Sequence, residues 1–381
     1  MRLKFFGLSL LICFWSTLLQ AADYETTAKN AVLMDFATGE YLYVKDADEP
    51  VPPASMSKLM TIYILLDKIK EGSIKLDDVF SVSENAWRKG GAATGGSTMF
   101  LSIGDNVSVE NLIKGIVIQS GNDACIAVAE NISGSEENFA ALMNETAQKI
   151  GLKNSKFANS TGLPHPDQRM SVADLAILSR LIIKDFPDLY HYFSEKEFTY
   201  NNIRQGNRNP LLYTMDGADG LKTGHTEEAG FCLAASATKG DRRLIEVMTG
   251  MNSNKERSDE GERLMNWGFE EFENQVLFAE GQIVASAKVW YGKQDKVNLA
   301  VSEEVLKTVR KDKASEIKSS VEFDEPITAP IVAGQILGTL KIEIPDAETR
   351  EIPLKAAENV DKLGLWGRFW ANIKFFIFGA K

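Results

Sequence analysis

The chain has 381 residues, 44% of them apolar and 25% charged, which is enough for one large domain and one small one. Its formal net charge is -11, whereas a nucleic-acid-binding protein normally carries a basic face. Composition therefore indicates a globular protein and argues against nucleic acid as a partner.

Residues 1–22 have the layout of a secretory signal peptide. Arg2 and Lys4 make a basic start, residues 5–19 are almost wholly apolar, and Ala21 and Ala22 are small. The alternative is an uncleaved membrane helix, but this run is shorter than the roughly 20 residues that a span needs. We expect cleavage near Ala22, so that the mature protein acts outside the cytoplasm.

The mature chain would keep two cysteines, Cys125 and Cys232, each within an apolar run. Two cysteines do not make a disulfide framework, so we predict buried free thiols. His165, His191 and His225 are isolated from one another, without the spacing of metal ligands. We predict no metal and no cofactor.

Residues 23–275 combine helical and strand-like patterns. Together they predict an α+β domain in which a helical cluster packs on a mostly antiparallel sheet, with strands drawn from both ends of the segment. The expected strands are 31–36, 41–45, 220–226, 231–238 and 243–249, and the expected helices are 54–70, one from 108 to a break at 120–122, 123–131, 137–150 and 171–184.

Residues 276–357 hold short alternating runs, which predict a small all-β domain. No set of polar residues converges within it, so we interpret it as a spacer or stalk. The expected strands are 283–291, 297–301, 317–323, 331–340 and 341–344.

Residues 358–381 favour an amphipathic helix. Its aromatic residues and scattered Lys and Arg are typical of a helix that lies in a membrane interface, with Arg368 and Asn372 on the polar side. A helix docked on its own protein is the alternative. The expected apolar face consists of Leu363, Trp366, Trp370, Ile373 and Ile377.

The segment Ser55-Met-Ser-Lys58 supplies a nucleophile and a base. Three residues along a helix place both side chains on one face, one turn apart. A serine hydroxyl is a weak nucleophile until a base takes its proton. A lysine can act as that base only when its amine is neutral. Burial beside the apolar residues Met56, Leu59 and Met60 would lower the lysine pKa, and a second cation such as Lys222 would lower it further.

An isolated match to this pattern carries little weight. Ser55 could simply begin a helix, with Lys58 solvated in its first turn. Ser315-Glu-Ile-Lys318 has the same spacing in a stretch with no supporting residues.

Two further motifs follow in order. Ser120-Gly121-Asn122 breaks a helical stretch, and we expect Gly121 to take a backbone shape that other residues resist, with Asn122 or Asp123 capping the next helix. Ser120 could relay a proton, and the Asn122 amide could hold Lys58 and a substrate carbonyl. As a lone feature, this segment would be a plain turn.

Lys222-Thr223-Gly224-His225 is strand-like. Lysine and threonine can bind a carboxylate, glycine lets a substrate lie against the strand edge, and His225 would orient the substrate. The three motifs in this order form a complete set for acyl transfer at a serine without histidine as base.

With these motifs the chain resembles the serine-type D-alanyl-D-alanine carboxypeptidases, the low-molecular-mass penicillin-binding proteins, with Gly121 in place of the usual aspartate. The resemblance covers nearly all of the chain after the signal and implies a β-lactamase/transpeptidase-like fold. It implies that Ser55 is the acyl-ester nucleophile and Lys58 its proton acceptor. The other implied site residues are Ser120, Asn122, Lys222, Thr223, Gly224, His225 and Arg208, with Gly162-Leu163 as a further lining segment.

The resemblance implies removal of the terminal D-alanine from peptidoglycan pentapeptide stems, with β-lactams as covalent inhibitors. It places the enzyme at the periplasmic face of the inner membrane. A β-lactamase is the nearest alternative, but residues 155–185 lack the Glu-x-x-Leu-Asn element of the class A enzymes. Endopeptidase action and a non-catalytic wall-binding protein stay open as further alternatives.

Overall fold

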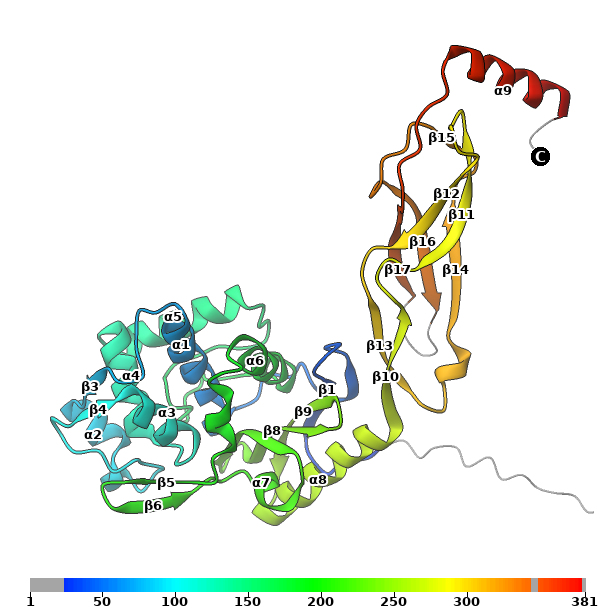
Figure 1. Cartoon of the computed structure of the whole chain (residues 1–381). Coiled ribbons are helices and arrows are strands. Elements are labelled where there is room, and N and C mark those ends of the chain that lie inside the picture. Colours follow the sequence, from blue (N-terminus) through cyan, green and yellow to red (C-terminus); the bar gives the residue numbers. More distant parts are fainter. Residues whose placement is uncertain (1–23, 344–348, 379–381) are drawn as a thin grey trace, which may run out of the picture.

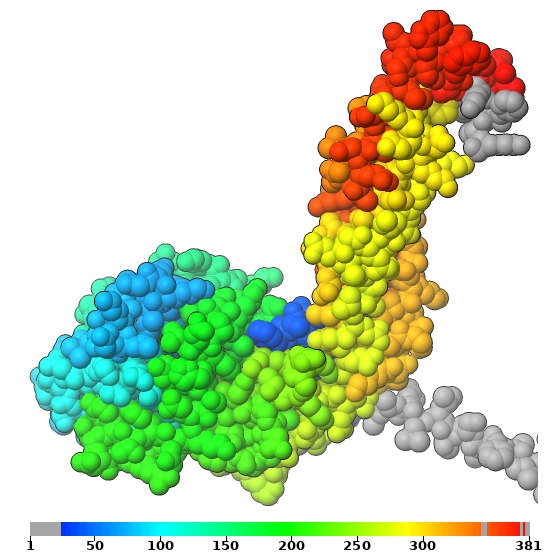
Figure 2. Space-filling model, in the orientation of Figure 1, coloured from blue at the N-terminus to red at the C-terminus, as the bar shows by residue number. Residues whose placement is uncertain are grey.

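The computed structural model describes residues 24–343 and 349–378. The predicted signal peptide, residues 1–22, lies outside the described residues. Figure 1 shows a body of helices and sheet, from which a long β-rich part extends to a terminal helix. The space-filling view in Figure 2 shows the same elongated shape, with the terminal helix at the far end from the body.

A five-stranded antiparallel sheet forms the centre of the body, in the order β2-β1-β9-β8-β7. The N-terminal hairpin pairs with β9, so the sheet combines strands from both ends of the segment, which confirms the predicted arrangement. Its strands are β1 (Asn30–Asp35), β2 (Tyr41–Lys45), β7 (Ala218–Thr226), β8 (Gly230–Lys239) and β9 (Arg242–Met251).

Helix α8 (Asn254–Glu271) covers one face of this sheet. Two glycines allow it to lie close: a Cβ on Gly268 would stand 2.4 Å from Leu33 Cδ2, and one on Gly261 would stand 2.7 Å from Leu233 Cδ2. The helices on the other face are α1 (Lys58–Lys70), α2 (Glu84–Gly90), α3 (Val109–Val117), α4 (Asn122–Ser133), α5 (Glu136–Lys149) and α6 (Val172–Asp185).

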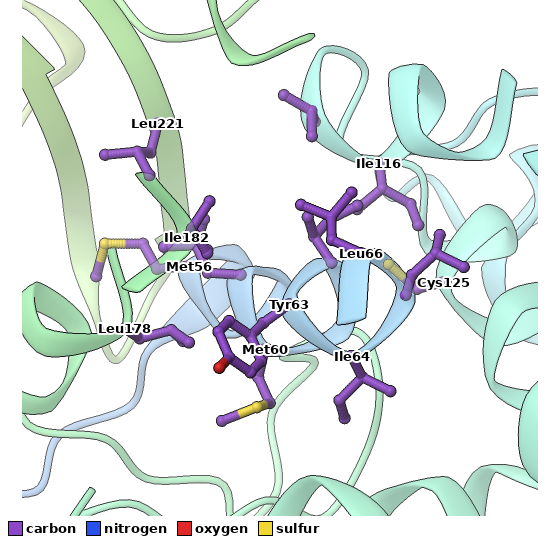
Figure 3. Packing of buried hydrophobic residues seen from close by; sticks show 14 of the residues in the cluster. Met56, Met60, Tyr63, Ile64, Leu66, Ile116, Cys125, Leu178, Ile182 and Leu221 are labelled. Atoms are coloured by element: carbon purple, nitrogen blue, oxygen red, sulfur yellow. The ribbon is translucent and has the colours of Figure 1, made fainter. Parts of the chain in front are cut away.

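Helix α1 runs through the middle of this helical layer. Every residue from Lys58 to Leu66 is buried, because the helix is apolar on all sides and is surrounded by other elements. Figure 3 shows side chains from α3, α4, α6 and β7 packed around it. Cys125 of α4 and Cys232 of β8 are both buried and free, as predicted.

Several short elements complete the body. They are the 3₁₀ turns η1 (Ala54–Ser57), η2 (Ala92–Thr94) and η3 (Tyr190–Ser194), the strand pairs β3 (Val79–Ser81) with β4 (Asn106–Ser108) and β5 (Glu197–Tyr200) with β6 (Ile203–Gly206), and α7 (Leu211–Thr214).

The β-rich part begins with the ribbon of β10 (Phe272–Phe278) and β13 (Val305–Arg310) and continues as a six-stranded sheet in the order β14-β16-β17-β12-β11-β15. It has its own apolar core, which includes Leu299, Leu340 and Leu354. The remaining elements are β11 (Ile283–Trp290), β12 (Lys296–Val301), η4 (Ala314–Glu316), β14 (Lys318–Phe323), β15 (Ile327–Thr328), β16 (Ile336–Glu343) and β17 (Arg350–Ala356).

The sequence missed some of these elements. The two expected strands at 331–340 and 341–344 are a single strand, β16, because the chain forms an irregular segment before Ile336. Helix α8 was also missed. It has a strongly polar sequence and buries only a narrow stripe, which includes Leu264, Met265 and Phe269.

The terminal helix α9 (Leu365–Phe378) starts later than the expected residue 358. Val360 is buried and forms a β-bridge with Ile331, so the residues just before the helix pack with the β-rich part. On α9 the exposed apolar side chains include Leu365, Trp366, Phe369, Trp370, Phe376 and Ile377. Within the described ranges, no helix has the length and apolar character needed to cross a membrane.

The Asp35 carboxylate joins the body to the ribbon. It is fully buried at the end of β1, where it accepts hydrogen bonds from the Ala37 amide at 2.9 Å and the Thr38 amide at 3.2 Å. Asn274 of β10 donates to it at 3.2 Å, and Arg242 forms an ion pair with it at 3.3 Å. Asp35 therefore fixes the turn after β1 and the start of the ribbon together.

We expect Asp35→Ala to lower the free energy of unfolding by about 3 kcal/mol, because the largely buried Arg242 would lose its partner. Urea denaturation measures this change. Lys255→Ala, which removes an exposed ion pair with Asp259, is the matched control and should leave the transition unchanged. Equal transition midpoints for both variants would contradict the role given to Asp35.

Candidate active site

Ser55 and Lys58 lie where the turn η1 leads into α1. Lys58 Nζ is 2.9 Å from Ser55 Oγ. The Lys58 side chain is 1% exposed, whereas Ser55 remains partly accessible. A ligand can therefore reach the hydroxyl while the amine behind it is shielded from water.

Burial, with a smaller contribution from the Arg208 cation, lowers the pKa of Lys58 to about 8. Its sequence neighbours Met56, Leu59 and Met60 are also buried. With this pKa, about a tenth of the Lys58 amines are neutral at pH 7. A neutral amine is therefore available beside Ser55 without a histidine.

The hydrogen bonds of Lys58 direct its lone pair. As an ammonium it donates to Ser55 Oγ, to Asn122 Oδ1 at 2.8 Å and to the Thr161 carbonyl at 2.6 Å. A neutral amine keeps only two donors and gains one acceptor site. The two carbonyl oxygens can only accept, so the lone pair must face the Ser55 hydroxyl.

Thr161 was not predicted to contact Lys58. It contributes a backbone carbonyl, which leaves no side-chain signal in the sequence. The adjacent Gly162 has φ +76°, and a Cβ on it would stand 2.0 Å from the Ala54 carbonyl oxygen. Glycine therefore lets this segment press against the turn that carries Ser55.

Ser120 lies at the break between α3 and α4, with φ +60°. Its hydroxyl is buried and has no hydrogen-bond partner among the described residues, which is uncommon for a buried polar atom. Asn122, two residues later, accepts a hydrogen bond from Lys58, so the structure brings the second motif into contact with the first.

The expectation for Gly121 was wrong. Its φ is -58°, which any residue can adopt, and the unusual backbone belongs to Ser120. Close packing requires the glycine instead, because a Cβ would stand 2.9 Å from Asp123 Oδ1 and 3.1 Å from the Met99 nitrogen.

Neither Asn122 nor Asp123 is the cap of α4, so the predicted cap is wrong. Gly121 is the N-cap of α4, and the Asp123 carboxylate binds the loop that precedes α3. It accepts from Thr98 Oγ1 at 2.6 Å, from the Met99 amide at 2.8 Å and from the Leu101 amide at 3.1 Å. The loop is thereby fixed beside the second motif.

Lys222, Thr223 and Gly224 lie on β7, the strand at the edge of the sheet nearest Ser55. A Cβ on Gly224 would stand 2.9 Å from Ala54 Cβ and 3.2 Å from the Ser55 nitrogen, so only glycine allows this approach. Lys222 and Thr223 are 3% and 5% exposed. His225 is exposed, and its ring lies 4.1 Å from the Phe231 ring.

Lys58, Lys222, Arg208 and Arg257 concentrate positive charge at this place. Burial and the nearby Lys58 and Arg208 cations lower the pKa of Lys222 well below its ordinary value. Burial also lowers the pKa of Arg257 to about 10. None of the four forms an ion pair with a carboxylate in the part of the chain that the structure describes. The site is therefore suited to an anionic ligand.

Arg257 was missed because α8, which carries it, was not predicted. Its guanidinium lies 3.5 Å from the Gly224 carbonyl oxygen, and its Nε is buried without a hydrogen-bond partner among the described residues. Arg208 lies on the exposed rim, where it donates a short hydrogen bond to the Ser97 hydroxyl. The S-x-x-K match at Ser315 and Lys318 forms no comparable site, because both residues are exposed on the β-rich part.

Comparison with known proteins agrees with this geometry. The D-alanyl-D-alanine carboxypeptidase family matches residues 17–253, and the C-terminal domain of penicillin-binding protein 5 matches residues 272–362. The D-alanyl-D-alanine carboxypeptidase DacC of Escherichia coli is 42% identical over 346 residues, covering 90% of this chain and 86% of that protein.

Solved structures show the same likeness. Penicillin-binding protein 5 of Haemophilus influenzae is 37% identical with a TM-score of 0.79, covering 90% of this chain and 99% of that one. The carboxypeptidase DacD of Francisella tularensis is 35% identical with a TM-score of 0.77, covering 90% of this chain and 95% of that one. The chain therefore belongs to the serine-type D-alanyl-D-alanine carboxypeptidase family.

Proposed function

We propose that Ser55 is the nucleophile with which this carboxypeptidase removes the terminal D-alanine from peptidoglycan pentapeptide stems. The observation that carries the proposal is the position of the buried Lys58 amine. Of the three groups that it contacts, only the Ser55 hydroxyl can donate a hydrogen bond to it.

In acylation, neutral Lys58 takes the Ser55 proton, and Oγ bonds to the carbonyl carbon of the penultimate D-alanine. The Ser55 amide, next to the β7 edge, helps to stabilise the oxyanion. When the C–N bond breaks, the proton passes to the departing amine. The buried Ser120 hydroxyl, which has no other partner among the described residues, is suited to relay it.

In deacylation, water attacks the Ser55 ester and Lys58 again accepts the proton. The ester C–O bond breaks, the shortened stem leaves as a carboxylic acid, and Ser55 recovers its hydrogen. No other nucleophile or cofactor is needed to balance these steps.

Substrate binding would use the remaining site residues. The substrate lies as an added strand along β7, which has a free outer edge in the described sheet. The terminal carboxylate of the substrate is attracted by Lys222, Thr223, Arg208 and Arg257. It supplies the negative charge that these cations lack as a partner. The Asn122 amide holds the substrate carbonyl, and His225 orients the acyl part.

Penicillins would acylate the same serine, because the lactam and its carboxylate mimic the scissile amide and the terminal carboxylate. Residues 155–185 hold no Glu-x-x-Leu-Asn element to orient a deacylating water, so we expect slow release of the antibiotic. Rapid turnover would favour a β-lactamase instead.

We expect Ser55→Ala to abolish both D-alanine release from a pentapeptide stem and covalent labelling by a fluorescent penicillin. Ser315→Ala changes the serine of the S-x-x-K match at 315–318 and is the matched control, which should keep full activity. Labelling that persists in Ser55→Ala and disappears in Ser315→Ala would contradict the assignment.

The acylation rate should rise with pH and level off above about 8, because the pKa of Lys58 is lowered and its neutral form dominates only above that value. Lys58→Arg should reduce acylation by about 100-fold or more, since a guanidinium stays protonated. Stopped-flow measurement with a chromogenic β-lactam tests both points.

Lys68→Arg, a partly exposed change on the same helix, is the control and should keep the wild-type profile. A flat pH profile in the wild type, or normal rates in Lys58→Arg, would contradict the role of Lys58.

For the chain as a whole, we propose a catalytic domain over residues 23–275, a β spacer over 276–357 and a membrane-binding segment over 358–381. Several large apolar side chains of α9 are exposed at the end farthest from the body, and such a patch favours a membrane surface. With cleavage of the signal, the enzyme would stand on the periplasmic face of the inner membrane.

Trp366→Ser combined with Trp370→Ser should release the protein from lipid vesicles in a flotation assay, because 79% and 60% of these two side chains are exposed on α9. Trp87→Ser removes an exposed aromatic residue from the body and should bind vesicles as the wild type does. Equal flotation of all three proteins would contradict anchoring through α9.

A further inference from the structure

The Thr161 carbonyl accepts the shortest of the three hydrogen bonds of Lys58, at 2.6 Å. Thr161 and the preceding Ser160 are both buried, so this contact is shielded from water. A backbone oxygen can meet an amine only when its peptide plane is turned toward that amine. The plane of the peptide between Thr161 and Gly162 must therefore be held in place.

Gln168 fixes the start of this segment. Its side-chain nitrogen donates to Ser57 Oγ at 2.6 Å, next to the turn position of Ser55. Its side-chain oxygen accepts from the backbone nitrogens of Ala158 and Asn159, at 2.7 and 3.1 Å. The segment therefore begins at a fixed place relative to the nucleophile.

Thr61 fixes the next residue of the segment. Thr61 Oγ1 lies on α1, three residues after Lys58, and donates to the Ser160 carbonyl at 2.7 Å. Both Thr61 and Ser160 are completely buried. These contacts of Gln168 and Thr61 involve residues 158–160, so they place the segment without orienting the peptide that follows Thr161.

The side chain of Asn159 orients that peptide. Its Oδ1 accepts hydrogen bonds from the Gly162 amide at 2.8 Å, and from the amide and hydroxyl of Thr161 at 3.1 and 2.9 Å. Its Nδ2 donates to the Leu163 carbonyl at 3.1 Å. One side chain thus binds three successive residues at the point where the segment meets Lys58.

The geometry of a peptide bond connects Asn159 to the amine. The Thr161–Gly162 peptide is planar and trans, so its N–H and its C=O point in opposite directions. Because Asn159 binds the N–H, the C=O faces Lys58 on the other side. Gly162 has φ +76° and no Cβ, so its backbone would tolerate other orientations. The Asn159 side chain selects this one.

We propose that Asn159 is a positioning residue for the reaction, which holds the Thr161 carbonyl against the Lys58 amine and thereby keeps the lone pair of that amine on Ser55. The inference rests on the proposed function, because it takes Lys58 as the base. Without this carbonyl, a neutral Lys58 would have two N–H donors and only the Asn122 oxygen to accept them. Its lone pair could then turn away from the hydroxyl.

Asn159→Ala should lower the plateau rate of acylation by a chromogenic β-lactam about tenfold, because the base is no longer oriented. It should also move the midpoint of the pH profile down by about one pH unit, because the charged form of Lys58 loses an acceptor. A segment that was merely loosened would lower the rate without moving the midpoint. Stopped-flow measurement over a range of pH gives both quantities.

Asn159→Asp tests the same position in the opposite direction. It keeps the oxygen acceptor and adds a negative charge, so it should keep most of the plateau rate and move the midpoint up. Should Asn159→Ala fail to fold, Asn159→Ser replaces it, since a serine hydroxyl forms such a turn more weakly. The midpoint of Asn159→Ser must then fall as well.

Asn144→Ala is the matched control. The Asn144 side chain also bridges the backbone of this segment, but at Phe157, where it binds the amide at 2.9 Å and the carbonyl at 2.7 Å. Its loss should lower the melting temperature and leave the midpoint of the pH profile at the wild-type value.

An unchanged midpoint in Asn159→Ala, or an equal shift in Asn144→Ala, would overturn the role given to Asn159 while Lys58 remains the base. Normal acylation by Lys58→Arg is a different outcome. It would overturn the proposed function, and the inference with it.

Discussion

The mechanism that we propose for this enzyme depends on one buried amine. Lys58 is buried and contacts three oxygen atoms, of which only the Ser55 hydroxyl can return a hydrogen bond. Burial makes the neutral amine accessible near neutral pH, and the two carbonyl acceptors point its lone pair at the nucleophile. In the proposed mechanism, desolvation and hydrogen-bond geometry let this lysine take the place of the histidine that many serine hydrolases use.

The fold supplies this arrangement from segments far apart in the sequence. Helix α1 carries Lys58 at its first residue, α4 brings Asn122, and the segment at Thr161 brings a carbonyl. Glycines at 162 and 224 let two backbone segments close on the Ser55 turn from different sides. The buried cations beside them leave a site that an anionic peptide end would neutralise.

The sequence predicted the parts of this account that depend on side-chain patterns. The apolar run of α1, the strands of the central sheet and the burial of Lys58 and both cysteines follow from periodicity and spacing. It missed α8 and with it Arg257, because a polar helix that packs through glycines shows only a weak apolar stripe. The Thr161 carbonyl and the positive φ of Ser120 are backbone features set by tertiary packing, so residue types could not reveal them.

The most direct test of the central claim is to titrate Lys58 itself, by following its side-chain NMR signal in folded protein with isotope-labelled lysine. Lys58→Arg identifies the signal, and the exposed lysines serve as internal references. The account predicts that the pKa of Lys58 lies near about 8. A pKa at the ordinary lysine value of 10.5 would contradict it, because the amine would then be almost entirely charged at the pH where the enzyme must act.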